Sequence, residues 1–352
     1  MPAIVNLLAA KRLPGLNTMS DFPLSIALPK VTIAIPTLNR VGYLRLALKS
    51  ALAQTYPNIE VIVSNNASTD DTAGYLNSCT DPRLRVLHQA TLLPMTGNWN
   101  ACLTDATGEY FLLLSDDDIL EPDAIRELVS GFAQQDGHTP PGLVYCGGCV
   151  INSAGDVTRI LRSSPPRESA RDLILAFLED KRDLRFCAVL LRTADLLPGF
   201  PASYKVACDA AVWMRAVIRH GSAVFIPKPL VRYRLHPNLS AATDLEVWRA
   251  EYKQLLELVI AEDDGVGRPD PGFAKHLSAV IRKVERDLIV GRINQEFGRN
   301  RGKALLEYGR RIPAFASARG LLSLTKGIVA LSLGERCRTW LRSKLRKQPT
   351  LE

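Results

Sequence analysis

The chain of 352 residues lacks any apolar stretch long enough to cross a membrane. No run of 18 uncharged apolar residues occurs in it, so the sequence predicts no transmembrane helix. Residues 1–15 also lack the order of a secretory signal, because their basic residues follow the apolar stretch. The chain contains no internal repeat and no low-complexity tract. With 47% hydrophobic and 23% charged residues, its composition is that of a soluble globular protein.

Cysteine is too sparse and too scattered for a disulfide framework. The seven cysteines are an odd number and are spread along the chain, which favours a reducing cytoplasm. Cys146 and Cys149 have the spacing of a metal or redox pair, but no second pair of this spacing accompanies them. We interpret both as buried small residues, with a zinc or redox role as the alternative.

The net charge of +8 is concentrated at the C-terminus. Residues 268–352 carry 19 Lys and Arg against 7 Asp and Glu, a net charge of +12, whereas the preceding residues sum to −4. Basic segments bind anionic lipids, nucleic acids or acidic partners. Residues 321–345 join an apolar half to a basic half. They predict either a helix on an anionic membrane surface or a helix packed on the rest of the protein.

A strand–helix alternation occurs four times in the first half of the chain. Strands are predicted over 31–36, 59–63, 84–88 and 110–114, each followed by apolar residues at helical spacing. This order predicts a mostly parallel α/β sheet with helices on both faces. Extended runs on both sides of residues 152–156 predict a hairpin, so antiparallel strands are expected next. Further predicted elements are a helix near 170–178, a strand over 186–191, a helix over 209–220, one or two strands over 223–235, and helices over 244–262, 273–298 and 315–346.

Three consecutive carboxylates, Asp116, Asp117 and Asp118, follow the fourth predicted strand. Neighbouring anions repel one another, so the triplet predicts a bound cation, and hard oxygen ligands favour Mg²⁺ or Mn²⁺. A solvated turn is the alternative. The first two strands end in residues 36–40 and 64–70, which are rich in amide and hydroxyl groups. Because the carboxyl ends of parallel strands share one edge, the three loops predict a nucleotide–metal site.

From about Val31 to Ser240 the chain resembles the family 2 glycosyltransferases, which have the GT-A fold. The resemblance rests on an ordered set of segments: IPTLNR, QTYPNIEVIVSNNASTDDT, GNWNACLTDATGEYFLLLSDDD, CDAAVWMRA and YRLHPNLS. It implies a Rossmann-like, mostly parallel sheet with antiparallel additions. We therefore expect an N-terminal extension over 1–29, a GT-A domain over 30–240 and a helical, basic C-terminal region over 241–352.

The resemblance implies a metal-dependent, inverting enzyme that moves one sugar from a nucleoside-diphosphate sugar to a glycan or glycolipid acceptor. It implies a role in bacterial surface polysaccharide synthesis. Asp209 is then the catalytic base, with simple helix capping as the alternative. The resemblance implies that Asp117 is the first ligand of the divalent cation, with Asp118 and His236 as further ligands. Asn66 is expected to contact the nucleobase, and the full set of expected donor contacts is Pro36, Thr37, Asn39, Arg40, Asn66, Asn98 and Asp116.

The chain departs from the family pattern at three places. Asn65 and Asn66 stand where many members carry acids, which leaves UDP, dTDP, GDP or CDP open as the donor nucleotide. Ser115 stands where an acid is common, so the metal ligand within the triplet stays open. The Gln-x-x-Arg-Trp signature of processive synthases is absent, which predicts one transfer per encounter.

We expect a protein of the cytoplasm, peripheral on the inner face of the plasma membrane, with no nucleic-acid partner. Two alternatives remain on the residues alone. One is a metal-dependent phosphotransfer enzyme, such as a nucleotidyltransferase or a phosphatase. The other is a nucleotide-binding scaffold on the same fold that has lost catalysis.

Overall fold

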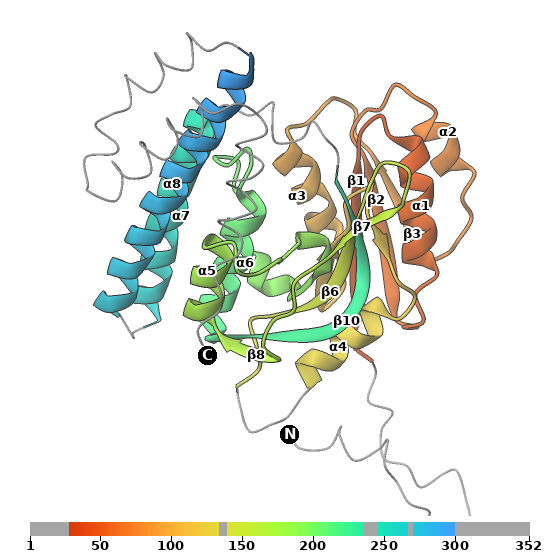
Figure 1. Ribbon diagram of the computed structural model, residues 1–352. Helices are drawn as coiled ribbons and strands as arrows, with labels where there is room; N and C mark the ends of the chain where they lie inside the picture. The colour runs from red at the N-terminus through yellow and green to blue at the C-terminus, as the bar shows by residue number, and fades with distance from the viewer. Residues whose placement is uncertain (1–27, 134–138, 236–244, 267–269, 300–352) are drawn as a thin grey trace, which may run out of the picture.

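The computed structural model describes residues 28–133, 139–235, 245–266 and 270–299. In this part of the chain one sheet has the strand order β3-β2-β1-β4-β9-β6-β10-β5, with β7 beside β6 and β8 beside β10 (Figure 1). The strands are β1 Val31–Thr37, β2 Ile59–Asn65, β3 Leu84–His88, β4 Tyr110–Leu113, β5 Ile119–Leu120, β6 Leu143–Ile151, β7 Val157–Ile160, β8 Arg167–Ser169, β9 Val189–Arg192 and β10 Ser222–Arg234.

The first four strands are parallel, and the later strands mix directions. β1 pairs in parallel with both β2 and β4, and β2 pairs in parallel with β3. β9 runs antiparallel to β4 and β6, while β10 runs parallel to β6. The predicted α/β class with a mostly parallel start and antiparallel additions is confirmed.

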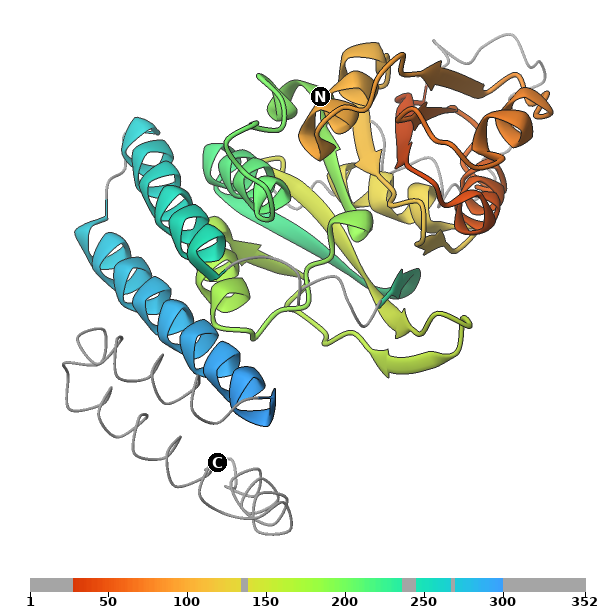
Figure 2. The same cartoon turned by 90° about the horizontal axis from the view of Figure 1, so that it is seen from above.

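Helices cover both faces of the sheet because successive strand residues alternate between them. Ile33 and Ile35 pack on one face with α1 Val41–Leu52, α2 Thr72–Asn77 and α4 Ala124–Ala133. Ala34 and Ile62 pack on the other with α3 Met95–Asp105, α5 Ala170–Leu178 and α6 Cys208–His220. α7 Leu245–Gly265 and α8 Pro271–Arg299 lie side by side and form an outer layer on α5 and α6 (Figures 1 and 2).

Most predicted elements occur, with differences at their ends. The predicted hairpin is β6–β7, where the side-chain oxygen of Asn152 accepts hydrogen bonds from the backbone of Ala154 and Asp156. The predicted strand over 186–191 begins instead with a 3₁₀ turn, Phe186–Ala188, before β9. The predicted helix over 315–346 lies outside the described residues.

α2 begins at Thr72, after the loop that follows β2. The Asp70 carboxylate accepts hydrogen bonds from the backbone nitrogens of Thr72 and Val41, the first residue of α1. Asp70 therefore ties the starts of two helices together at the edge where β1 and β2 end.

None of the described helices is long and apolar enough to cross a membrane.

Candidate functional site

The end of β1 is joined to the acidic loop after β4 by a buried hydrogen bond. The hydroxyl of Thr37 donates to Oδ2 of Asp116 at 2.8 Å, and the two residues are 2% and 6% exposed. Burial raises the pKa of Asp116, and the hydrogen bond from Thr37 and the charge of Arg40 oppose that rise. Thr37 also lies in register with Asn65 at the end of β2. The ends of β1, β2 and β4 therefore meet as predicted.

One guanidinium bridges two of the three acids. Nη1 of Arg40 donates to Oδ1 of Asp116 at 3.3 Å and to Oδ2 of Asp117 at 3.0 Å. Arg40 immediately precedes α1, so the β1–α1 loop brings its charge to the acids. The Arg40 side chain is 38% exposed, whereas both carboxylates are nearly buried. One positive charge thus already offsets part of the mutual repulsion of the two carboxylates.

The third acid faces the interior of the protein. Asp118 is 1% exposed, and its Oδ1 accepts a hydrogen bond of 2.7 Å from the backbone nitrogen of Arg234 in β10. Burial and the neighbouring charge of Asp117 raise the pKa of Asp118 to about 7. Arg234 in turn donates to the backbone oxygens of Asp117, Asn152 and Ser153. Asp118 therefore anchors the acidic loop to β10, and its role as a further metal ligand stays a prediction.

Asn39 joins the loops that follow β1 and β2. Its Oδ1 accepts hydrogen bonds from the backbone nitrogen and the hydroxyl of Thr69, at 2.7 and 3.2 Å. Its own backbone nitrogen donates to the hydroxyl of Ser68. Asn39 adopts a φ of 54°, which asparagine tolerates better than most residues. It shapes the rim of the site, and Pro36 lies just before it at the end of β1.

The side chains of Asn66 and Asn98 are already occupied by protein partners. The Asn66 amide accepts from the Leu93 nitrogen at 2.8 Å and donates to the Leu93 oxygen at 2.9 Å. The Asn98 amide accepts from the Ser64 hydroxyl and donates to the Ser64 backbone oxygen. Both asparagines are 4% exposed. They hold the β3–α3 loop and α3 against the end of β2, so the geometry gives them positioning roles at this edge.

Asp209 lies in the first turn of α6 and is partly buried. Its Oδ1 accepts a hydrogen bond of 2.8 Å from the backbone nitrogen of the next residue, Ala210. The N-cap residue of α6 is Ala207, and its side chain makes no capping hydrogen bond. Burial raises the pKa of Asp209, the charge of Arg185 opposes the rise, and the charge of Glu251 adds to it. Asp209 is therefore not the N-cap residue, which was the alternative to a base role.

Arg185 is a charged neighbour of Asp209 that was not predicted from the sequence. Its guanidinium lies over the Tyr233 ring, 4.9 Å from the centroid, and Nη2 donates to Asp183 at 3.2 Å. Burial raises the pKa of both Asp209 and Tyr233, and the charge of Arg185 opposes both rises. In the sequence Arg185 is one of many arginines and lies in a polar stretch, so no pattern distinguished it.

Comparison with known proteins finds a family domain within the chain. The family model described as Glycosyl transferase family 2 matches residues 32–187. These residues form a family 2 glycosyltransferase domain. The finding confirms the predicted family and enzyme class, and it favours glycosyl transfer over the phosphotransfer alternative.

Several bacterial proteins that are similar to this chain are named as glycosyltransferases. An uncharacterized glycosyltransferase from Rickettsia felis is 35% identical over 151 residues, 41% of this chain and 24% of the relative. One from Rickettsia typhi is 28% identical and covers 67% of this chain and 74% of the relative. The GalNAc(5)-diNAcBac-PP-undecaprenol beta-1,3-glucosyltransferase of Campylobacter jejuni is 31% identical over 38% of this chain and 42% of the relative. The chain thus spans about a quarter of the first relative's length.

Two solved structures share the fold of this chain. TarS 1–349 from S. aureus, in complex with UDP, has a TM-score of 0.54 at 20% identity and covers 72% of this chain and 70% of its own. The mannosyltransferase PcManGT from Pyrobaculum calidifontis, in complex with GDP-Man and Mn²⁺, also has a TM-score of 0.54 at 20% identity. It covers 89% of this chain and 83% of its own.

Asp116 and Asp117 fit a divalent cation of the type that a substrate diphosphate helps to hold. Mg²⁺ is commonly bound by one or two carboxylates together with phosphate oxygens and water. Within the described residues no group of three acidic, histidine or cysteine side chains could hold a metal without such help. This also leaves Cys146 and Cys149, both buried in β6, without further ligands there. The predicted ligand His236 lies outside the described residues.

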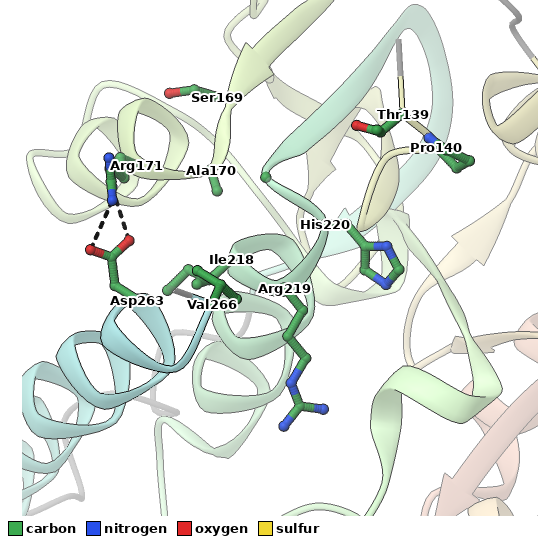
Figure 3. A pocket seen from close by; sticks show the side chains of 11 residues that line it. Thr139, Pro140, Ser169, Ala170, Arg171, Ile218, Arg219, His220, Asp263 and Val266 are labelled. Atoms are coloured by element: carbon green, nitrogen blue, oxygen red, sulfur yellow. Dashed lines mark hydrogen bonds and ion pairs between the residues drawn. The ribbon is translucent and has the colours of Figure 1, made fainter. Parts of the chain in front are cut away.

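A cavity of the protein lies at the opposite edge of the sheet from the acids. It is bounded by the starts of α5 and β10 and by the ends of α6 and α7, with Arg171 paired to Asp263 in its wall (Figure 3). β10 runs parallel to β6, so its first residue lies at the edge where parallel strands begin. This cavity is therefore separate from the acidic loop.

Proposed function

We propose that this glycosyltransferase moves one sugar, with inversion, from a nucleoside-diphosphate sugar to a hydroxyl of a glycan or lipid-linked acceptor. The observation that carries the proposal is the bridge from Arg40 to Asp116 and Asp117. It gathers two carboxylates and a guanidinium at the edge where β1, β2 and β4 end. Such an edge is where open α/β sheets bind ligands.

The donor would lie along this edge. Asp117, with Asp116 beside it, would hold a divalent cation on the diphosphate. When bound there, the cation supplies positive charge to the leaving diphosphate. Thr37 keeps Asp116 oriented through its hydrogen bond. The guanidinium of Arg40 is more exposed than the two carboxylates that it contacts. It would contact the donor phosphate or ribose. Asn39, Asn66 and Asn98 would shape the nucleoside pocket through the loops that they fix.

Asp209 would accept the proton of the acceptor hydroxyl as that oxygen attacks the anomeric carbon. A base must be deprotonated and must project from a rigid element. The first turn of α6 provides such an element, and burial gives the Asp209 carboxylate a raised pKa and thus a stronger basicity. In-line attack from the face opposite the diphosphate inverts the anomeric configuration, and it needs no protein nucleophile.

A lipid-linked acceptor at the cytoplasmic face of a membrane is the acceptor we favour. The name of the Campylobacter jejuni relative includes undecaprenol, which supports this choice. The basic residues 321–345, which the sequence analysis associates with anionic lipid, lie outside the described residues. The pathway would be bacterial surface polysaccharide assembly.

A thermal-shift screen tests the proposal. Full-length protein is heated with UDP-, dTDP-, GDP- and CDP-linked sugars, each with and without Mn²⁺. We expect one nucleotide class to raise the melting temperature by several degrees, and only when Mn²⁺ is present, because a ligand that binds the folded state stabilises it. Absence of a metal-dependent shift with every donor contradicts the proposal. A shift without any release of nucleoside diphosphate supports the scaffold alternative.

A further inference from the structure

A carboxylate from α7 lies against the start of α6. Glu251 is 2% exposed, and its oxygens accept hydrogen bonds from three successive backbone nitrogens. The distances are 2.6 Å to Lys205, 3.0 Å to Val206 and 2.8 Å to Ala207. Glu251 lies outside the region matched by the family model and outside the GT-A domain expected from the sequence, 30–240.

These contacts hold the N-cap residue of α6 and the two residues before it. The first N–H groups of a helix have no partner within the helix, and its N-terminus carries a partial positive charge. Ala207, the N-cap residue, cannot cap α6 with its methyl side chain. Glu251 supplies a full negative charge and two acceptor atoms at this point, and hydrogen bonds to an ionised acceptor are the stronger kind. The segment before α6 is thus fixed by a residue more than 40 positions later in the chain.

Asp209 follows Ala207 by two residues, so whatever fixes this segment also fixes the orientation of Asp209. The charged and titratable groups that act on Asp209 come from three elements: Arg185 before β9, Cys208 in α6, and Glu251 and Tyr252 in α7. Tyr252 is next to Glu251, and the charge of Asp209 raises its pKa, after the larger effect of burial. α7 packs on α6 and contacts the segment that leads to Asp209.

We propose that Glu251 is a positioning residue for glycosyl transfer: from α7 it holds Lys205–Ala207 and the first turn of α6, and thereby aims the Asp209 carboxylate at the acceptor. The inference rests on the base role proposed for Asp209. It makes α7 part of the catalytic unit.

The competing explanation is that Glu251 only holds α7 against α6. A second contact between the same two helices, at their other end, provides a control. There Arg219 of α6 donates two hydrogen bonds of 3.0 Å to Glu262 of α7. This ion pair also joins α6 to α7, close to the cavity wall in which Figure 3 shows Arg219. It lies at the end of α6 remote from Asp209. If Glu251 only holds the two helices together, Glu262→Gln and Glu251→Gln should therefore have the same effect.

The test compares Glu251→Gln, Glu251→Asp and Glu262→Gln in the full chain. The assay follows nucleoside-diphosphate release from whichever UDP-, dTDP-, GDP- or CDP-sugar the thermal-shift screen selects. For Glu251→Gln we expect kcat to fall at least tenfold with the KM for the donor unchanged. The NH₂ group of glutamine is a donor and cannot accept hydrogen bonds from the three backbone N–H groups. We also expect the acidic limb of the pH profile to move to lower pH, since a negative charge near Asp209 is removed. Glu262→Gln should match the parent in both.

Glu251→Asp covers the case in which Glu251→Gln does not fold. It keeps the charge on a shorter side chain, so we expect a reduced kcat with the acidic limb in place. Hydrogen exchange at the amides of residues 205–207 should accelerate in both Glu251 variants but not in Glu262→Gln. Folded Glu251 variants with the parent's kcat and pH profile overturn the inference. If Asp209→Asn also keeps normal turnover, the base role itself is wrong. An inactive Asp209→Asn beside normal Glu251 variants refutes the positioning role alone.

Discussion

Nη1 of Arg40 lies 3.0 Å from Oδ2 of Asp117, and the same nitrogen lies 3.3 Å from Oδ1 of Asp116. One positive charge thus holds together two carboxylates that would otherwise repel each other. The pairing is asymmetric, because the arginine side chain is 38% exposed and the acids are nearly buried. Because the guanidinium is the more exposed partner, a competing cation can displace it towards solvent while the carboxylates stay in place. The acids keep their positions for a competing cation.

Arg40→Ala should increase the affinity of the protein for Mn²⁺ in the absence of nucleotide. The guanidinium and the metal compete for the same two carboxylates, so its removal favours the metal. A half-exposed ion pair is worth about 1 kcal/mol, which corresponds to a roughly fivefold lower Kd. Isothermal titration calorimetry measures this directly. Arg45→Ala is the control, since Arg45 in α1 contacts Asp71 at 3.7 Å and lies away from the triplet. Weaker Mn²⁺ binding to Arg40→Ala contradicts the competition.

Asp117→Ala should abolish the metal-dependent part of the thermal shift with the donor nucleotide, because the proposed cation loses its main ligand. Asp118→Asn is the matched variant on the next residue. Its side-chain oxygen can still accept the hydrogen bond from the Arg234 nitrogen, so the loop should keep its path and the metal-dependent shift should persist. The reverse result, with Asp118→Asn losing the shift and Asp117→Ala keeping it, would show that the metal lies on the inward acid.

The sheet and its acidic edge could be predicted because both depend on local sequence. Apolar runs with breaks give strands, and the residues directly after those strands must lie at one edge of a parallel sheet. Thr37, Asp116 and Asp117 were found in this way. Their mutual contacts follow from the pairing of β1 with β4, a strand order that the strand–helix alternation alone does not specify.

The partners of buried polar groups could not be predicted, because they depend on loop paths and on distant elements. Asn66 was assigned to a nucleobase from the resemblance, yet its amide contacts the backbone of Leu93 in a loop without a periodic pattern. Glu251 is one of several acids in a helix of mixed charge, and its three partners are backbone nitrogens that leave no trace in the sequence. Only the packing of α7 on α6 distinguishes Glu251 from the other acids of α7.

Asp209→Asn should keep donor binding and lose transfer by about 100-fold or more, the usual contribution of a general base. In the parent, kcat/KM should fall as pH drops through the pKa of Asp209, which burial places above its ordinary value. A pH–rate profile measures this acidic limb. Normal turnover by Asp209→Asn contradicts the base role.

The same substitution should not reduce stability at pH 7. A carboxyl whose folded-state pKa is raised stabilises the protein only below its unfolded pKa, and this contribution is lost as pH rises through the folded value. At neutral pH the ionised Asp209 is therefore a cost that asparagine avoids. We expect the melting temperature of Asp209→Asn at pH 7 to equal or exceed that of the parent. A lower melting temperature would indicate that the carboxylate is needed for the fold.

Glu60→Gln should destabilise the protein without affecting catalysis. Glu60 lies near the start of β2 and accepts hydrogen bonds from Lys30 at 2.8 Å, Thr32 at 2.6 Å and both the nitrogen and hydroxyl of Thr107 at 2.7 and 2.8 Å. Burial alone would raise its pKa, but these hydrogen bonds outweigh burial and lower the pKa to about 2. At pH 7 the ionised form thus contributes on the order of 3 kcal/mol, which a neutral glutamine forfeits.

The pH dependence of that loss separates it from a general packing defect. A depressed folded-state pKa gives stability that is present above the unfolded pKa of about 4.3 and disappears as pH falls towards the folded value of about 2. Urea unfolding should therefore show a large difference between Glu60→Gln and the parent at pH 7 and a much smaller one near pH 2.5. Glu109→Gln, on an exposed side chain at the same edge of the sheet, should show little difference at either pH. A pH-independent deficit in Glu60→Gln would mean that shape, and not the carboxylate charge, accounts for the role of Glu60.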